Sequence, residues 1–229
     1  ELKIRMTRKI TITGSEGIVG KELCKFFKKE DVIPLDLKNG HDLTDEKFVK
    51  KWFKNNQTDY LINCFALNDH IEKNKKKNTL FNIPLKVFSK YLEINLTALF
   101  SVCREFALNN KKSGIVNFSS TYGLVSPRPE LYDGNHKDIA YGISKAGVIN
   151  LTKYLAIHLS PNINVNCIIP GGIKANQNKK FISNYSKLTP KNRMMNKNEL
   201  SPLVDYLCSK KSSYVTGASF VIDGGYTIW

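Results

Sequence analysis

The sequence lacks the features of a membrane or secreted protein. It has no run of about 18 consecutive apolar residues, so we expect no membrane-spanning helix and no membrane partner. No secretory signal pattern opens it, and we therefore expect a cytoplasmic protein. Met6 is one possible native start, and residues 1–5 are then a leftover; the other possibility is that residues 1–5 belong to an alternative beginning.

Cysteine and histidine are few and scattered. The five cysteines stand at positions 24, 64, 103, 167 and 208 without a C-x-x-C pair, and the four histidines stand apart at 41, 70, 136 and 158. An odd, scattered set of cysteines argues against a disulfide framework and for reduced, buried thiols. Because no group of side chains has the spacing of a metal site, we expect no catalytic metal.

Acidic residues are outnumbered by basic ones, 20 to 35, which gives a net charge of +15. Such a charge favours nucleic acid, a membrane surface or an anionic ligand, or it serves solubility alone. No nucleic-acid-binding motif accompanies it, so we expect no nucleic-acid partner. Residues 174–198 contain no acid and seven cations: Lys174, Lys179, Lys180, Lys187, Lys191, Arg193 and Lys197.

Short apolar runs alternate with amphipathic stretches along the 229 residues. The runs predict strands at 9–13, 32–35, 60–65, 114–118, 164–169 and 219–222. The stretches predict helices at 17–29, 45–54, 84–109, 140–159 and 199–209, with room for a reduced strand before residue 60. This alternation is typical of βαβ units. We expect an α/β fold, a Rossmann-type doubly wound parallel sheet, in a single domain over residues 1–229.

A glycine-rich turn joins the first predicted strand to the first predicted helix. It reads Thr13-Gly14-Ser15-Glu16-Gly17-Ile18-Val19-Gly20. Glycines let the backbone turn tightly and approach a pyrophosphate, whose charge faces the helix N-terminus. The strand–glycine–helix order therefore predicts that these eight residues bind a dinucleotide.

Acidic residues follow the second predicted strand. Asp36 ends that strand, where a carboxylate accepts hydrogen bonds from ribose hydroxyls and repels a 2′-phosphate. This favours NAD over NADP, and the nearby Lys38 keeps NADP possible. Asp42 and Leu43 either line the adenine pocket or belong to a helix cap with Thr44-Asp45.

Tyr141 and Lys145 are four residues apart in a predicted helix, so their side chains share one face. A nearby ammonium favours phenolate and would lower the pKa of Tyr141 from about 10 toward working pH. The phenol then becomes a proton-transfer group. Ser119-Ser120 precedes the pair at the end of a predicted strand, which adds weight to it.

In this order the motifs resemble the short-chain dehydrogenase/reductase family over nearly the whole chain. The resemblance rests on Thr13 to Gly20, on Asn63-Cys64-Phe65-Ala66 where the family has N-N-A-G, on Asn95, on residues 114–120, on Tyr141 and Lys145, on Pro170-Gly171-Gly172-Ile173, and on residues 214–217 and 221–226. It implies an NAD(P)-dependent oxidoreductase acting on CH–OH groups. It also implies that Asn63, Cys64, Phe65 and Ala66, and Pro170 to Ile173, bind the cofactor.

The resemblance further implies the catalytic roles. Tyr141 exchanges a proton with the substrate oxygen, and Lys145 lowers its pKa and holds the nicotinamide ribose. Ser120 orients the substrate oxygen, with Ser119 as the second choice. Asn95 kinks its helix and supports a water that links Lys145 to solvent.

Part of the sequence is also similar to dehydrogenases that modify flagellin and surface sugars. That similarity rests on residues 120–127, on 170–173 with Asn176-Gln177, and on 223–229. It implies a sugar or nucleotide-linked sugar as substrate. The alternatives are an epimerase or dehydratase with retained NAD, and a catalytically silent NAD-binding sensor or scaffold.

Two segments are expected to form the substrate loops, 121–140 and 172–198. Loops on a rigid scaffold commonly carry specificity, so Arg128 and Tyr132 are candidate substrate contacts. Arg193 can hold a carboxylate or phosphate in a bidentate fork, and its basic surroundings predict an anionic small-molecule substrate. Two long apolar helices and the resemblance predict a homodimer or homotetramer.

Overall fold

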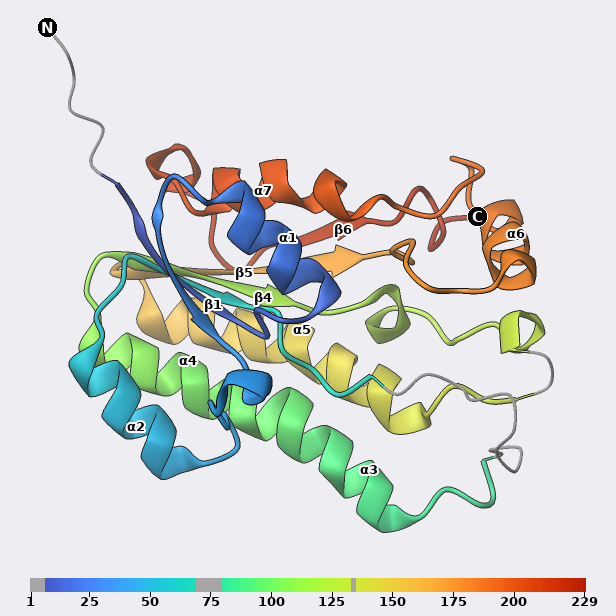
Figure 1. Ribbon diagram of the computed structural model, residues 1–229, viewed down its shortest axis with the longest axis horizontal. Helices are drawn as coiled ribbons and strands as arrows, with labels where there is room; N and C mark the ends of the chain where they lie inside the picture. Colours follow the sequence, from blue (N-terminus) through green and yellow to red (C-terminus); the bar gives the residue numbers. More distant parts are fainter. Residues whose placement is uncertain (1–6, 69–79, 133–134) are drawn as a thin grey trace, which may run out of the picture.

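A computed structural model describes residues 7–68, 80–132 and 135–229. Six parallel strands form one sheet in the order β2-β1-β3-β4-β5-β6 (Figure 1). They are β1 (Lys9–Thr13), β2 (Asp31–Leu35), β3 (Tyr60–Asn63), β4 (Ser113–Phe118), β5 (Ile163–Pro170) and β6 (Ser219–Ile222). The strand order reverses beside β1, and open α/β sheets bind ligands at the carboxyl ends of the strands near such a point.

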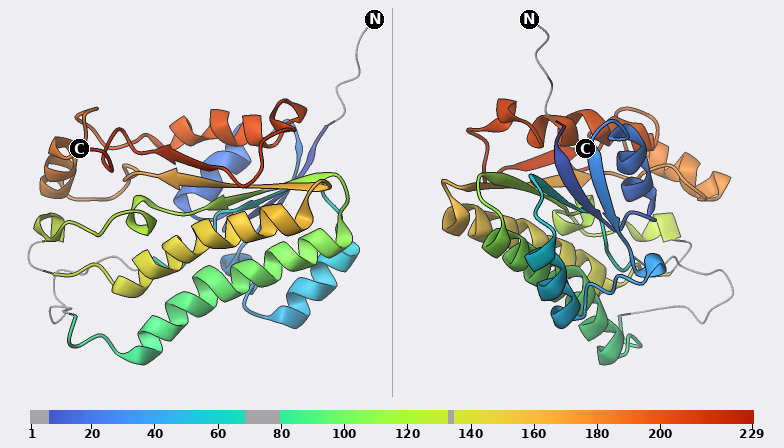
Figure 2. Two further views of the ribbon diagram at one scale, coloured as in Figure 1. Left: turned by 180° about the vertical axis from the view of Figure 1, so that it is seen from behind. Right: turned by 60° about the vertical axis from the view of Figure 1, so that its left-hand side comes forward.

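Helices cover both faces of the sheet (Figures 1 and 2). One face carries α1 (Ile18–Phe26) and α7 (Ser201–Leu207). The other carries α2 (Glu46–Asn55), α3 (Leu85–Leu92), α4 (Ala98–Asn109) and α5 (Ile139–Leu159). The short helix α6 (Lys179–Lys187) lies apart, beyond the carboxyl end of β5.

Each helical layer packs on the sheet through its own apolar core. Neighbouring residues of one strand enter different cores: Ile115 packs with α2, α4 and α5, whereas Val116 packs with α1 and α7. This follows from the alternation of side chains along a strand. With both faces covered, the inner strands β1, β3, β4 and β5 are buried almost continuously, as parallel strands usually are, whereas the edge strands β2 and β6 are partly exposed.

The sequence-based elements are confirmed with differences at their ends. The third strand stops at Asn63 instead of residue 65. The described residues between β2 and β3 hold a 3₁₀ turn (Leu37–Asn39) and α2, so the reduced strand expected there is absent from them. The long helix predicted at 84–109 is interrupted by a π-helical turn, Glu93–Thr97, and the helix predicted at 199–209 begins as a 3₁₀ turn, Lys197–Leu200.

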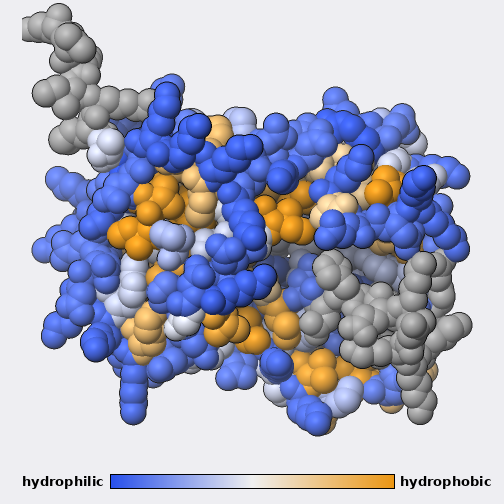
Figure 3. Space-filling view, viewed as in Figure 1, coloured by the Kyte–Doolittle hydropathy of each residue, from blue (hydrophilic) through white to orange (hydrophobic). Residues whose placement is uncertain are grey.

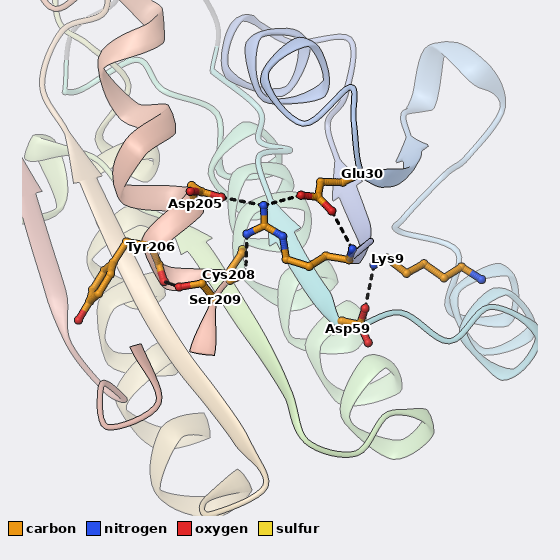
Figure 4. A network of polar contacts seen from close by, with 8 residues as sticks. Lys9, Glu30, Asp59, Asp205, Tyr206, Cys208 and Ser209 are labelled. Carbon is orange, nitrogen blue, oxygen red and sulfur yellow. Dashed lines mark hydrogen bonds and ion pairs between the residues drawn. The ribbon is translucent and has the colours of Figure 1, made fainter. Parts of the chain in front are cut away.

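A charged network ties together the amino edge of the sheet (Figure 4). The Nη2 atom of Arg8 lies 2.8 Å from Glu30 Oε1 and 2.8 Å from Asp205 Oδ1, and its Nη1 atom donates to the Cys208 carbonyl at 2.9 Å. The Arg8 amide donates to Glu30 Oε2 at 2.7 Å. One guanidinium therefore joins the start of β1 to the turn before β2 and to the end of α7.

The surface in Figure 3 is mostly hydrophilic, with apolar side chains in small separate groups and a recess near its centre. Among the described residues, no helix has the length and apolar character needed to cross a membrane.

Candidate active site

The glycine turn after β1 forms a tight cradle. Gly14 adopts a left-handed conformation, with φ +66°, and a Cβ there would lie 2.5 Å from the Phe65 amide nitrogen. A Cβ on Gly20 would lie 2.1 Å from the Gly14 carbonyl oxygen, whereas one on Gly17 would lie 3.2 Å from the same oxygen. Positions 14 and 20 therefore accept only glycine without a backbone shift.

The cradle fits the phosphates of a dinucleotide. Gly17 is the N-cap of α1 and makes no side-chain capping bond, so the first amides of the helix have no side-chain acceptor from the cap. The Ser15 hydroxyl is buried and has no hydrogen-bond partner within the described part of the chain. Amides at a helix N-terminus favour an anion, and a buried hydroxyl without a partner adds a donor beside them.

Asp36 lies against this cradle at the end of β2. Its Oδ2 atom accepts the Glu16 amide at 2.9 Å, and its Oδ1 atom accepts the Lys38 amide at 2.9 Å. The two bonds fix the carboxylate, and each oxygen keeps capacity for another donor. This position suits the predicted contact with a ribose.

The pair Asp42 and Leu43 has other partners. Asp42 Oδ1 accepts both the amide and the hydroxyl of Thr44, at 2.9 and 2.6 Å, while Asp45 caps α2. The Leu43 side chain is buried in the core with Phe53. The capping alternative therefore describes this segment better than a lining of the adenine pocket.

Asn63 belongs to a buried polar chain that crosses the sheet. Its Oδ1 atom accepts the Thr13 hydroxyl at 3.0 Å, and its Nδ2 atom donates to Asn117 Oδ1 at 2.9 Å. Asn117 Nδ2 donates in turn to the Thr152 hydroxyl at 3.1 Å. The Asn63 amide was expected at the cofactor, but these bonds use it to hold β1, β3 and β4 to α5.

The next residues lie where the chain leaves β3. The Cys64 amide donates to the Thr13 carbonyl at 3.0 Å, and burial raises the pKa of the Cys64 thiol. The Phe65 backbone faces Gly14, and Ala66 follows it, half-buried. Cys64 and Phe65 thus form a wall beside the cradle through their backbone.

The structure distinguishes between the two serines that follow β4. The Ser119 hydroxyl donates to the Lys145 carbonyl at 2.6 Å and is used within the fold. The Ser120 hydroxyl accepts the Tyr122 amide at 3.2 Å and lies near enough to the Tyr141 phenol to lower its pKa. Ser120, the first choice from the sequence, is therefore the serine that lies with Tyr141.

Lys145 is the third side chain near Ser120 and Tyr141. Its ammonium donates to the Phe118 carbonyl at 2.9 Å and lies 6.0 Å from the centre of the Tyr141 ring. Burial lowers the pKa of Lys145 to about 8. Burial also raises the pKa of Tyr141, and the neighbouring Ser120 hydroxyl lowers it only in part. Burial dominates in this arrangement and Ser120 supplies the opposing effect, so the lowering by Lys145 that was expected from the sequence stays a prediction.

Asn95 occupies the π-helical turn between α3 and α4. Its Oδ1 atom accepts the Leu67 amide at 2.7 Å, and its Nδ2 atom donates to the Leu67 carbonyl at 3.1 Å and to the Ser144 hydroxyl at 3.0 Å. Ser144 donates to the Tyr141 carbonyl at 2.8 Å. Single π-helical turns are frequent at functional sites, and this one places Asn95 two hydrogen bonds from the backbone of Tyr141.

The turn after β5 borders the same edge. Pro170 ends the strand, and the Gly171 amide donates to the Ile222 carbonyl at 2.8 Å. The Gly172 amide donates to the Tyr185 hydroxyl, and Ile173 pairs with Met195 in an isolated parallel bridge. We call residues 172–198 the flap.

The three candidate substrate residues are engaged within the fold. The Arg193 fork holds Glu199 through two bonds of 2.7 and 2.6 Å, which keep the pKa of Glu199 at about 2. The Tyr132 hydroxyl lies 2.6 Å from that of Tyr122. Arg128 donates to the Trp229 carbonyl at 3.1 Å and borders a surface pocket of about 390 Å³. Glu199, just beyond the acid-free stretch, thus occupies the fork that was expected to bind substrate.

Sequence reasoning missed Tyr122, Tyr185 and Tyr226 at this end of the molecule. They stand far apart in the chain, in a 3₁₀ turn, a short helix and an irregular C-terminal segment. No periodicity relates such positions, so only the folded chain brings them together. In the described residues, no group of three or more potential ligands gathers around a metal site. Residues 1–6, His70 and Asp133-Gly134 lie outside those residues.

Comparison with known proteins identifies the class. The sequence pattern of the family described as enoyl-(acyl carrier protein) reductase matches residues 18–227. A 3-oxoacyl-[acyl-carrier-protein] reductase, FabG, of Buchnera aphidicola subsp. Acyrthosiphon pisum is 31% identical over 83% of this chain and 75% of its own. Post-translational flagellin modification protein A of Campylobacter coli is 27% identical over 95% of this chain and 97% of its own.

Among solved structures, a short chain dehydrogenase from Leptospira borgpetersenii serovar Hardjo-bovis with bound NAD⁺ superposes with a TM-score of 0.85. It is 32% identical, and the match covers 97% of this chain and 93% of that one. The protein therefore belongs to the short-chain dehydrogenase/reductase family of NAD(P)-dependent oxidoreductases, and the resemblance and the fold predicted from the sequence are confirmed.

Proposed function

We propose that this oxidoreductase transfers a hydride between NAD and an alcohol or carbonyl group of an anionic sugar or nucleotide-linked sugar. The observation that carries the proposal is that the hydroxyls of Ser120 and Tyr141 lie together at the carboxyl edge of the sheet, with the Lys145 ammonium 6.0 Å from the centre of the Tyr141 ring. The glycine cradle after β1 opens at the same edge, which is where ligands of open α/β sheets bind.

Tyr141 and Ser120 have different roles at one substrate oxygen. Bound NAD⁺ supplies the hydride acceptor, and NADH supplies the donor. In the reductive direction, Tyr141 gives its phenolic proton to the carbonyl oxygen while Ser120 holds that oxygen by a hydrogen bond. Because burial raises the pKa of Tyr141, the phenol stays protonated at neutral pH, which is the form that reduction requires. Oxidation runs through the same atoms, with Tyr141 receiving the proton.

The position of Asp36 supports a preference for NAD. Its carboxylate is fixed by the amides of Glu16 and Lys38 beside the cradle, so a 2′-phosphate brought there would meet a fixed negative charge. Side-by-side titrations with NADH and NADPH test this preference. Tighter binding of NADPH would contradict it, and Asp36→Asn is expected to narrow the difference between the two.

The flap supports an anionic substrate through its electric field. All seven of its cations are exposed, whereas Phe181, Ile182 and Tyr185 of α6 pack inward. Arg193 and Lys197 are paired with Glu199 and Glu22, so the field comes mainly from the other lysines of the flap and acts at a distance. Such a field raises the local concentration of an anion, and salt screens it. The kcat/KM for a charged substrate should therefore exceed that for its neutral analogue at low salt and lose the advantage at high salt.

The sugar assignment is supported by the relative named a flagellin modification protein. The relatives named 3-oxoacyl-[acyl-carrier-protein] reductase make a 3-oxoacyl thioester the second candidate. NADH oxidation measured with a panel of keto sugars, nucleotide-linked keto sugars and acetoacetyl thioesters separates the two. Turnover of the thioester alone would overturn the sugar assignment. Co-purified NAD without net turnover would favour an epimerase or dehydratase, or a silent NAD-binding protein.

The outer surface of α4 and α5 supports a homodimer or homotetramer. The two helices lie side by side on one face of the molecule (Figure 2, left). Leu108 is 73% exposed and Ile157 76% exposed, and the helices border an apolar groove of about 180 Å³. Large exposed apolar side chains on adjoining helices are typical of a surface that another chain covers. Sedimentation at micromolar concentration should give an oligomer that Leu108→Glu dissociates, and a monomeric wild type would contradict the proposal.

A further inference from the structure

Five aromatic side chains join the flap to the rest of the site. This tyrosine cluster consists of Tyr122, Tyr132, Phe181, Tyr185 and Tyr226. They come from the turn after Ser120, the following substrate loop, α6 and the C-terminal segment. Segments that are distant in sequence therefore share one small core at the carboxyl edge of the sheet.

Within the cluster, Tyr185 makes the contact that reaches the active-site turn. Its ring lies parallel to that of Tyr226, with centroids 5.0 Å apart and an angle of 6° between the planes. Its hydroxyl oxygen accepts the Gly172 amide. A Cβ on Gly172 would lie 2.6 Å from Tyr185 Cζ, so the turn and the ring fit only because residue 172 is glycine.

Gly172 and Ser120 follow neighbouring strands at the carboxyl edge of the sheet. Phe118 of β4 pairs with Ile168 of β5; Ser120 comes two residues after the end of β4, and Gly172 comes two residues after the end of β5. The Gly172 carbonyl accepts the Met195 amide at 2.9 Å. Within the flap, the Gly172 amide is therefore held by Tyr185 of α6, and the Gly172 carbonyl is held by Met195 near the end of the flap.

The other side of the catalytic pair is held by the same cluster. Tyr122 packs against the small apolar cluster that contains Tyr141, and its hydroxyl lies 2.6 Å from that of Tyr132. The Tyr132 ring lies 5.9 Å from that of Phe181 on α6. The turns that follow β4 and β5 are thus both fastened to the flap, and they cannot shift independently while the cluster is packed.

We propose that Tyr185 is a positioning residue for the cofactor site: its hydroxyl fixes the Gly172 amide, so that the turn after β5 is ordered before NAD binds. This inference rests on the NAD dependence proposed above. A turn that is already ordered removes a conformational cost from binding, whereas a loose turn must be ordered at the expense of affinity. A single hydrogen bond of this kind contributes about 1 kcal/mol, which corresponds to about a fivefold change in Kd.

The test compares two variants that each remove one phenolic oxygen from the same ring stack. Tyr185→Phe deletes the acceptor for Gly172. Tyr226→Phe is the matched control, because its buried hydroxyl has no hydrogen-bond partner in the described part of the chain. NADH binding is measured by fluorescence titration, and hydrogen exchange of the peptide around residues 170–175 reports the amide directly.

We expect Tyr185→Phe to raise the Kd for NADH about fivefold and to lose protection at residue 172, with Tyr226→Phe within about twofold of wild type. Gly172→Ala, which pushes on the same contact from the other side, should raise the Kd as well. An unchanged Kd in Tyr185→Phe, or an equal rise in Tyr226→Phe, would overturn the positioning role while leaving the proposed function intact. Absence of NADH binding by the wild type would overturn both.

Discussion

The two edges of the sheet use polar side chains in opposite ways. At the amino edge, Arg8, Glu30 and Asp205 are charged, and their charges pair with one another across three elements. At the carboxyl edge, Ser120 and Tyr141 are neutral, and the nearby Lys145 ammonium is bonded to a carbonyl rather than to a carboxylate. The first set is complete within the fold and stabilises it. The side chains at the carboxyl edge keep donors and acceptors for a ligand. Substitutions at the amino edge should therefore change stability, and substitutions at the carboxyl edge should change activity.

The largest expected effect is at the carboxyl edge. Tyr141→Phe removes the phenol that we propose transfers the proton but keeps the ring that packs against Tyr91. Turnover should fall by about 10²–10⁴-fold, the usual loss for general acid–base catalysis, while NADH still binds. Steady-state assays and NADH titration on the same sample check both statements. Tyr154→Phe, exposed on the same helix, is the control; more than a tenth of wild-type turnover in Tyr141→Phe would contradict the assignment.

The glycine cradle should give the next largest effect. Gly20→Ala would place a methyl carbon 2.1 Å from the Gly14 carbonyl, so the turn must shift away from its phosphate-binding shape. Overpacking of this kind costs about 1–3 kcal/mol, which corresponds to a rise of roughly 5–160-fold in the Kd for NADH. Gly17→Ala, with 3.2 Å to the same oxygen, is the matched control. Equal Kd values for the two variants would show that the cradle is not tight at position 20.

Most of the fold was predictable because local patterns determine it. The periodicity of apolar residues and the residues that end helices and strands located the secondary-structure elements. The glycine turn identified the edge of the sheet that binds a ligand. Ser120, Tyr141 and Lys145 were predicted because their types and order are specific. The interruption at Asn95 was expected as a kink, but a π-helical turn adds one residue to a hydrogen-bonded ring, and no side-chain pattern reports that directly.

The errors concern long-range partners. The sequence could not show that Glu199 fills the Arg193 fork, because a side chain's partner depends on how an irregular loop folds back. It could not show that burial raises the pKa of Tyr141, because burial is a property of the packed site. The tyrosine cluster is likewise assembled from distant segments.

At the amino edge, the expected effect is on stability alone. Arg8→Ala leaves Glu30 and the Cys208 carbonyl without the guanidinium, whose side chain is only 18% exposed. The free energy of unfolding should fall by about 2–3 kcal/mol, with the Kd for NADH unchanged in the folded protein. Arg104→Ala is the comparison, because Arg104 pairs with Glu46 and Glu105 but is 36% exposed, and exposed pairs contribute at most about 1 kcal/mol. Urea unfolding decides, and equal losses in the two variants would show that burial does not distinguish the networks.

The smallest expected effect links the carboxyl edge to pH. Burial lowers the pKa of Lys145 from 10.5 in the unfolded chain to about 8 in the fold, so between these values the unfolded state binds more protons. The free energy of unfolding therefore rises with pH in this window, because the penalty for burying the ammonium is present below pH 8 and is relieved as the pH approaches 10.5.

Lys145→Met removes this titration and leaves the others in place. The wild-type free energy of unfolding minus that of Lys145→Met should rise by about 2 kcal/mol between pH 7 and 9.5. Burial raises the pKa of both neighbouring thiols, Cys64 and Cys167, and because both remain in the variant their contributions largely cancel in the difference. Lys153→Met, an exposed change on the same helix, controls for loss of a lysine. A free-energy difference that stays level or falls with pH would show that burial of the Lys145 ammonium does not destabilise the fold. The two edges would then not differ at Lys145 in the way described above.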